Sequence, residues 1–170
     1  IMKAIRSMIQ SCDANKQEQV LSDQLLHLTT TLLTHRHLTV RKEAFFLGAC
    51  IIKKMMTNNT RLSDIQSDLL NKWVNVLRSV GASDQPFDAR MGAAVALSIS
   101  GLLLDGSSIS NIQWKKASLH CSLLSLQLLE DDDEDIRHAA GTAVAEAVSG
   151  AVDLGISIDH SSHVPHAQGD

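Results

Sequence analysis

The chain of 170 residues has little of what builds sheets or small secreted folds. It has no Tyr, only three Phe and two Trp, and only two Pro. With so few strand-favouring aromatics and helix breakers, a composition rich in Leu, Ala and Ser favours helices. Its three cysteines, Cys12, Cys50 and Cys121, are widely spaced and form no CxxC pair. Cys50 and Cys121 fall within apolar helical stripes, so we predict free buried thiols in a reducing compartment.

Motifs of catalysis are also missing. The sequence has no phosphate-cradling glycine loop, no GxSxG elbow and no HExxH. Cys121 stands beside His120, but adjacent helical positions point in different directions, and nothing in the spacing selects a Cys–His pair. We therefore expect no enzyme, no catalytic residue and no cofactor.

No segment resembles a membrane span or a signal peptide. The longest apolar stretch, from Ala93 to Leu104, contains two serines and is shorter than the roughly 20 residues that a span requires. We expect no membrane association and a cytoplasmic location, with the nucleus as an alternative.

Charge is divided unevenly along the chain. Residues 1–85 carry 11 Lys and Arg against 7 Asp and Glu, whereas residues 86–170 carry 4 against 12. Phosphate contacts need clustered cations, so the acidic half argues against wrapping nucleic acid by itself. The basic residues gather around one predicted helix, either as a solvated outer face or as a docking patch for RNA or an acidic protein. The candidates are Arg36, Lys42, Lys53, Lys54 and Arg61.

The most informative feature present is an internal repeat. Arg41, Arg90 and Arg137 stand 49 and 47 residues apart, each preceded by an apolar residue and followed three residues later by Ala. From these points the apolar residues advance in steps of four, three and four, as on the buried face of a helix. They are Val40, Ala44, Leu47 and Ile51 in the first segment and Ile136, Ala140, Ala143 and Ala147 in the third.

A period in the forties built of helix pairs is typical of helical solenoids. We predict an all-α fold: a right-handed α-solenoid of about three antiparallel helix pairs, preceded by a partial N-terminal helix. The repeats should span 17–56, 62–104 and 111–149 within a helical segment 1–150, and 151–170 should form a polar tail with little to bury. Because no polar end caps are evident, we expect a segment of a longer protein.

The individual helices are predicted at 17–35, 39–56, 62–80, 86–104, 111–129 and 133–149. Ser63 with Gln66 and Ser110 with Gln113 predict capping boxes. Ala93 and Ala140 should lie at close helix contacts, with larger side chains opposite them. The first helices should bury Leu21, Leu25, Leu28 and Leu32, then Leu62, Ile65, Leu69, Trp73, Leu77 and Val80, then Ala117, Cys121, Leu124 and Leu128.

The acidic run 130–135 invites a calcium interpretation but lacks the central Gly and the trailing Glu of such a loop. It stands directly before a helix, where negative charge complements the exposed amides, and we interpret it as a capping and solvation feature. His160, His163 and His166 follow in the predicted tail, which offers no metal geometry. We expect no metal site.

Acids also accompany two of the repeated arginines. Asp88 and Asp135 stand two residues before Arg90 and Arg137, whereas Thr39 takes that place before Arg41. The main interpretation is structural, with Asp and Arg side chains pairing between neighbouring repeats as a ladder. Binding of a partner through the arginines is the alternative.

The segment 128–140, with its acidic run, Ile136-Arg137 and Ala139-Ala140, resembles a HEAT repeat. The resemblance covers residues 17–149 and implies an armadillo-type fold that binds other molecules. The leucine-rich helix, acidic run and Ile-Arg of 123–137 are similar to the C-terminal region of the thyroid adenoma-associated protein family. That resemblance implies a noncatalytic auxiliary subunit of a tRNA 2′-O-methyltransferase, with a separate catalytic subunit and tRNA reached through the assembly.

A second function from another class stays open. HEAT repeats also occur in transport receptors and phosphatase scaffolds, so the chain could be a protein–protein adaptor with no RNA role.

Overall fold

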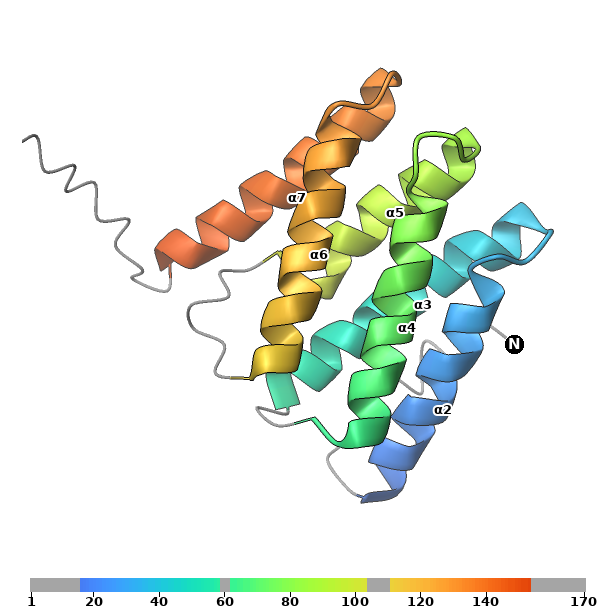
Figure 1. Ribbon diagram of the computed structural model, residues 1–170, viewed down its shortest axis with the longest axis vertical. Helices are drawn as coiled ribbons and strands as arrows, with labels where there is room; N and C mark the ends of the chain where they lie inside the picture. The colour runs from blue at the N-terminus through green and yellow to red at the C-terminus, as the bar shows by residue number, and fades with distance from the viewer. Residues whose placement is uncertain (1–15, 59–61, 104–110, 154–170) are drawn as a thin grey trace, which may run out of the picture.

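The computed structural model describes residues 16–58, 62–103 and 111–153, and within these residues it contains helices and no strand (Figure 1). The prediction of an all-α fold is confirmed there. The helices are α2 (Lys16–Leu32), α3 (Leu38–Asn58), α4 (Asp64–Val80), α5 (Phe87–Ser100), α6 (Ile112–Leu129) and α7 (Glu134–Asp153).

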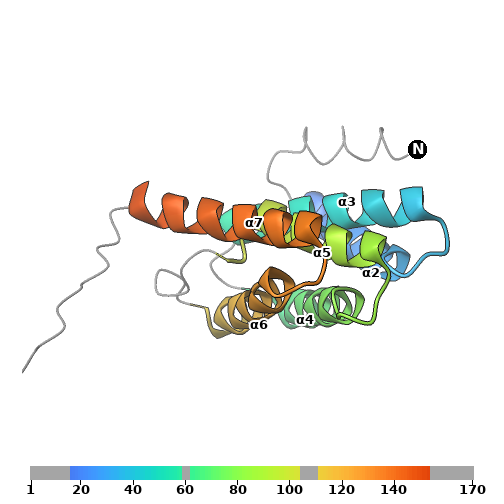
Figure 2. The ribbon, with the colours of Figure 1, turned by 90° about the horizontal axis from the view of Figure 1, so that it is seen from above.

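The helices form two layers: α2, α4 and α6 lie in front of α3, α5 and α7 in Figure 1, and Figure 2 shows α4 and α6 on one side of α3, α5 and α7. Short turns at 33–37, 81–86 and 130–133 join them into pair 1 (α2, α3), pair 2 (α4, α5) and pair 3 (α6, α7). Within one layer α2 packs on α4 and α4 on α6, and within the other α3 packs on α5 and α5 on α7. Each pair therefore contacts the next pair through both layers.

Local capping explains where several helices begin and end. The predicted capping box of α4 is confirmed: Ser63 Oγ accepts from the Gln66 amide at 3.2 Å, and Gln66 Oε1 accepts from the Ser63 amide at 3.1 Å. For α6 the cap is Asn111, whose side chain accepts from the Gln113 amide at 2.8 Å. The predicted cap Ser110 was therefore one residue early, and it lies outside the described residues.

The observed C-terminal ends differ from the predicted ones in four helices. Helix α3 continues to Asn58, past the predicted residue 56. Helix α5 ends at Ser100 because Gly101 adopts a left-handed conformation with φ 72°, which favours glycine. Helix α2 ends at Leu32, before the predicted residue 35. Helix α7 continues to Asp153, past the predicted boundary of the helical segment, and the rest of the predicted tail lies outside the described residues.

Small residues allow the layers to approach closely. A methyl group added to Gly92 of α5 would lie 2.4 Å from the ring of Phe45 in α3. One added to Gly48 of α3 would lie 2.6 Å from the indole nitrogen of Trp73 in α4. Ala93 and Ala140 are fully buried, as predicted. The large Phe45 and Trp73 side chains therefore pack against glycines of a neighbouring helix.

The predicted buried face of α2 is correct only in part. Leu25 and Leu32 are half-buried against the core, but Leu28 is 46% exposed, and the fully buried residues are Leu26, Thr29 and Leu33. The Thr29 hydroxyl donates to the Leu26 carbonyl at 3.0 Å, so its polar group is satisfied within the helix and it can occupy the core. In α4 the exposed Ile65 also departs from the prediction, while the four residues predicted for the buried face of α6 are buried.

Candidate functional site

The three repeated arginines fasten the turns of their own helix pairs. Arg41 Nη1 donates to the His35 carbonyl at 2.9 Å, and Arg137 Nη1 donates to the Asp131 carbonyl at 2.7 Å. Arg90 Nη1 makes a longer contact, at 3.4 Å, with the Ser83 carbonyl. The equivalent positions of the repeat therefore have equivalent roles, because each guanidinium holds the turn that precedes its helix.

Arg90 makes a further contact, which joins pair 2 to pair 3. Its Nη1 lies 3.2 Å from Asp131 Oδ1 and 2.9 Å from Asp132 Oδ1. The Asp131 side chain is 3% exposed and that of Asp132 is 84% exposed. The hydrogen bond from Arg90 holds the pKa of the Asp132 carboxyl below its usual value, with a second contribution from Asp131. An ionic contact therefore does cross between repeats.

The acids of this contact differ from those that the sequence suggested. Among the described residues Asp88 and Asp135 are not partners of Arg90. The Asp135 amide instead donates to Asp133 Oδ1 at 3.0 Å, and the Asp133 carbonyl accepts from the Arg137 amide at 3.1 Å. Asp133 thus caps α7, in line with a capping role for part of the acidic run.

The candidate basic residues are spread along pair 1. Arg36 lies in the turn between α2 and α3, Lys42 in the first turns of α3 and Lys53 near its end, and all three are exposed. Eleven residues of helix separate Lys42 from Lys53, which corresponds to about 16 Å. Lys54 is half-buried, and Arg61 lies outside the described residues. The described cations form an extended row and not a compact patch.

No feature of the described residues assembles a catalytic or metal site. Cys121 is buried, and burial raises the pKa of its thiol to about 12, which keeps it protonated and unreactive. Burial also lowers the pKa of the neighbouring His120, with Arg78 and Lys116 contributing. In the part of the chain that the structure describes, no three His, Cys, Asp or Glu side chains gather as metal ligands would.

The outer face of α6 carries a row of exposed aliphatic side chains that the sequence analysis did not single out. Its four members are between 50% and 72% exposed: Ile112, Leu119, Leu123 and Leu126. Seven, four and three residues separate them, so they follow one side of the helix over about 21 Å. Two exposed lysines, Lys115 and Lys116, lie among them near the start of the helix.

Helix α4, in the same layer, shows that this row is unusual. Its exposed residues are polar with the exception of Ile65, and they include Asp68, Lys72, Asn75 and Ser79. Single exposed apolar residues are ordinary, but a contiguous group more often marks an interaction site. None of the described helices is both long enough and apolar enough to cross a bilayer.

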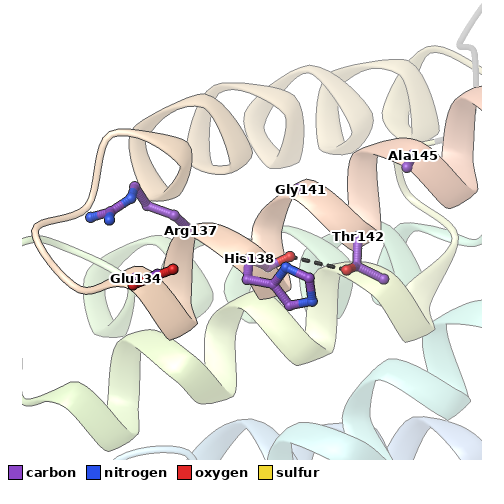
Figure 3. A pocket seen from close by; sticks show the side chains of 6 residues that line it. All are labelled: Glu134, Arg137, His138, Gly141, Thr142 and Ala145. Atoms are coloured by element: carbon purple, nitrogen blue, oxygen red, sulfur yellow. Dashed lines mark hydrogen bonds between the residues drawn. The ribbon is translucent and has the colours of Figure 1, made fainter.

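A shallow hollow of about 550 Å³ lies along one side of α7 (Figure 3). Its lining is mainly small and polar: Glu134, Arg137, His138, Gly141, Thr142 and Ala145. The Thr142 hydroxyl donates to the His138 carbonyl at 3.0 Å, within the same helix. The side chains that line the hollow do not converge on one point.

Comparisons with known proteins add no family to this description. No protein-family model, curated protein or solved structure matches the chain.

Proposed function

We propose that the chain is a noncatalytic HEAT-like scaffold, a right-handed α-solenoid of three helix pairs, that binds a partner protein through the outer face of α6. The two-layer packing, with pair following pair, supports the repeat arrangement. The aliphatic row on α6 is the observation that carries the binding role, because the matching face of α4 is polar.

The surface suits a protein of mixed apolar and acidic character. Leu119, Leu123 and Leu126 offer apolar area toward the end of α6, and Lys115 and Lys116 offer positive charge between Leu119 and the exposed Ile112 near its start. Apolar contacts at the centre of an interface with charges at its rim are typical of protein–protein recognition.

The test is recovery of proteins from cytosolic extract on the immobilised chain, before and after nuclease treatment. Leu119→Gln with Leu123→Gln should abolish recovery of the bound proteins, because it removes the apolar centre while keeping good helix formers. Asn75→Gln with Ser79→Gln on α4 is the matched control and should retain them. Equal recovery by parent and α6 variant would remove this face from consideration.

A supporting role in tRNA 2′-O-ribose methylation is the second candidate. The resemblance to the thyroid adenoma-associated protein family suggests it, and the exposed cations Arg36, Lys42 and Lys53 provide a row that RNA phosphates could follow. In this version the partner is a separate methyltransferase subunit, and its recovery with tRNA should be sensitive to nuclease.

Charge reversal tests direct RNA contact. Lys53→Glu with Lys54→Glu should weaken tRNA affinity and flatten its salt dependence, since each lost phosphate contact removes a counterion-release term. Lys115→Glu with Lys116→Glu changes net charge equally on another helix and should alter neither. If both double variants bind tRNA as the parent does, with equal salt slopes, the protein-only adaptor is the better description.

A further inference from the structure

Helix α5 contacts α7 through one side, and the repeat positions that form this side are exposed or half-buried on α7. We call this side of α7 its open side. Aligning Arg90 with Arg137 places Ala94 at the position of Gly141 and Ser98 at that of Ala145. On α5 these residues are at the contact with α7: Arg90 and Ala94 are buried, and the Ser98 hydroxyl donates to Glu146 Oε2 at 2.6 Å. The equivalent positions on α7 are exposed or half-buried.

The first interface of the stack repeats the burial at the position of Ala94, although Arg41, the equivalent of Arg90, is half-buried there. The residue of α3 equivalent to Ala94 is Phe45, which is buried with its ring against Gly92 of α5. The same helical position is therefore covered by the next pair in both interfaces that the structure contains. At Gly141 an added methyl group would meet only Leu129, at an ordinary 3.8 Å.

The hollow shown in Figure 3 overlaps this open surface. Arg137, Gly141 and Ala145 in its lining are equivalent to Arg90, Ala94 and Ser98, whereas Glu134 and Thr142 are equivalent to α5 residues that stay exposed. Val148, one turn beyond, is 51% exposed and extends the surface with an apolar side chain. Glycine and alanine along a helix allow another helix to approach closely, as Gly92 does with Phe45.

Charge identifies the kind of occupant. Arg90 binds Asp131 and Asp132 in the turn of the pair that follows it. Arg137 stands at the equivalent place on α7, is only half-buried, and has its carbonyl contacts within its own turn. A hairpin that packed on α7 as pair 3 packs on α5 would bring its turn to Arg137, so acidic residues in that turn would be favoured.

Charge disfavours a second copy of this chain stacked head to tail as the occupant. The turn of pair 1 contains His35, Arg36 and His37. Such stacking would bring Arg36 close to Arg137, and like charges at an interface oppose association.

We propose that the open side of α7, with Arg137 at its start, binds an α-helical hairpin whose turn carries acidic residues, in the arrangement by which α5 holds pair 3. This inference rests on the repeat arrangement proposed above, and it requires neither the α6 row nor RNA.

The test adds a second copy of pair 3, a hairpin that already packs on α5 in this structure. In an extended chain, residues 101–150 are repeated once after Gly150, which adds a fourth pair through the same linker that joins pairs 2 and 3. Stacked repeats stabilise their neighbours, so the urea midpoint should rise above that of the parent. Amide hydrogen exchange of residues 137–148 should slow by about tenfold or more, because opening of α7 then requires loss of the added interface.

Two further variants isolate the acidic turn. Asn in place of both appended copies of Asp131 and Asp132 should reduce the rise in midpoint. Arg137→Gln should remove the difference between the acidic and the neutralised extensions. A midpoint and an α7 exchange rate equal to those of the parent would overturn the proposal, as would an Arg137→Gln effect of the same size in both extensions.

Sedimentation of the 170-residue chain tests the choice of occupant. A monomer at all concentrations is expected, and a dimer that Arg137→Gln dissociates would overturn the assignment of an acidic hairpin. Failure of partner recovery through α6 would leave all these results unchanged, so the two proposals can fail separately.

Discussion

Arg90 makes three contacts that together join two helix pairs. One guanidinium nitrogen reaches the Ser83 carbonyl in its own turn and the carboxylates of Asp131 and Asp132 in the next. The long arginine side chain carries its positive charge from α5 to a point between the two turns, where one nitrogen can contact both.

Replacing Arg90 by Gln should cost more stability than the same change at Arg41. The first variant leaves the buried Asp131 carboxylate without its cation, and we expect a loss of about 2–3 kcal/mol. Arg41 contributes its contact with the His35 carbonyl, and its loss should cost about 1 kcal/mol. Urea unfolding of both variants and the parent measures the two losses, and equal values would show that the contact between pairs contributes nothing.

The lowered pKa of Asp132 predicts a pH dependence of defined sign. Because the folded-state pKa lies below the unfolded one, the carboxylate stabilises the fold above the ordinary Asp value of about 4, and this contribution is lost as pH falls through the folded-state value. The parent should therefore unfold at higher urea than Asp132→Asn at pH 7, with the gap closing in acid. A gap that persists unchanged to pH 3 would rule out the Arg90–Asp132 pair as its source.

At this scale the sequence predicts the equivalence of the three arginines but not the acids that Arg90 binds. Asp88 and Asp135 are close to the arginines along the chain, whereas Asp132 is 42 residues away from Arg90. Six acids stand together in the run 130–135, and their order alone does not show that Asp131 turns inward while Asp132 stays exposed. The stacking of pair 3 on pair 2 decides between them.

Helices α5 and α7 contain glycines whose surroundings differ. A methyl group at Gly92 would collide with Phe45, whereas one at Gly141 would meet ordinary van der Waals contact with Leu129. Both positions lie inside helices, where alanine is intrinsically favoured over glycine by about 1 kcal/mol.

Gly92→Ala and Gly141→Ala should therefore change stability in opposite directions. We expect Gly92→Ala to destabilise by about 1–2 kcal/mol, because overpacking exceeds the gain in helix propensity. Gly141→Ala should stabilise by about 0.5–1 kcal/mol. Thermal melts give both signs directly. Stabilisation by both substitutions would mean that α3 and α5 pack less closely than described.

The buried face of α2 shows where periodicity stops being informative. Leucines at 21, 25, 28 and 32 form one regular stripe, and Leu26 and Leu33 begin another that includes Thr29. Hydropathy favours the leucine stripe, but the stripe that contains Thr29 is the more buried one. Thr29 can be buried because its hydroxyl donates to the Leu26 carbonyl of its own helix. In α6, where small and large apolar residues follow a single stripe, the sequence predicts the face correctly.

At the scale of the whole molecule, the repeat has a functional consequence. Each helix pair contributes an outer helix, α2, α4 or α6, and only α6 places several aliphatic side chains on its exposed face among the residues described. The candidate RNA-binding cations Arg36, Lys42, Lys53 and Lys54 lie on pair 1, and the acidic turn lies on pair 3. In the scaffold proposed above, successive helix pairs therefore offer different chemistry to a partner.

The central claim, that helix pairs are units stabilised mainly by their neighbours, is tested most directly by removing one. In a chain that ends at residue 103, pairs 1 and 2 keep the contacts of α2 with α4 and of α3 with α5. We expect far-ultraviolet circular dichroism to show α2 to α5 still helical, with cooperative unfolding at a lower urea midpoint than in the full chain. Loss of the helical signal from all four helices under conditions where the full chain is folded would contradict it, because a single indivisible core would then hold the molecule together.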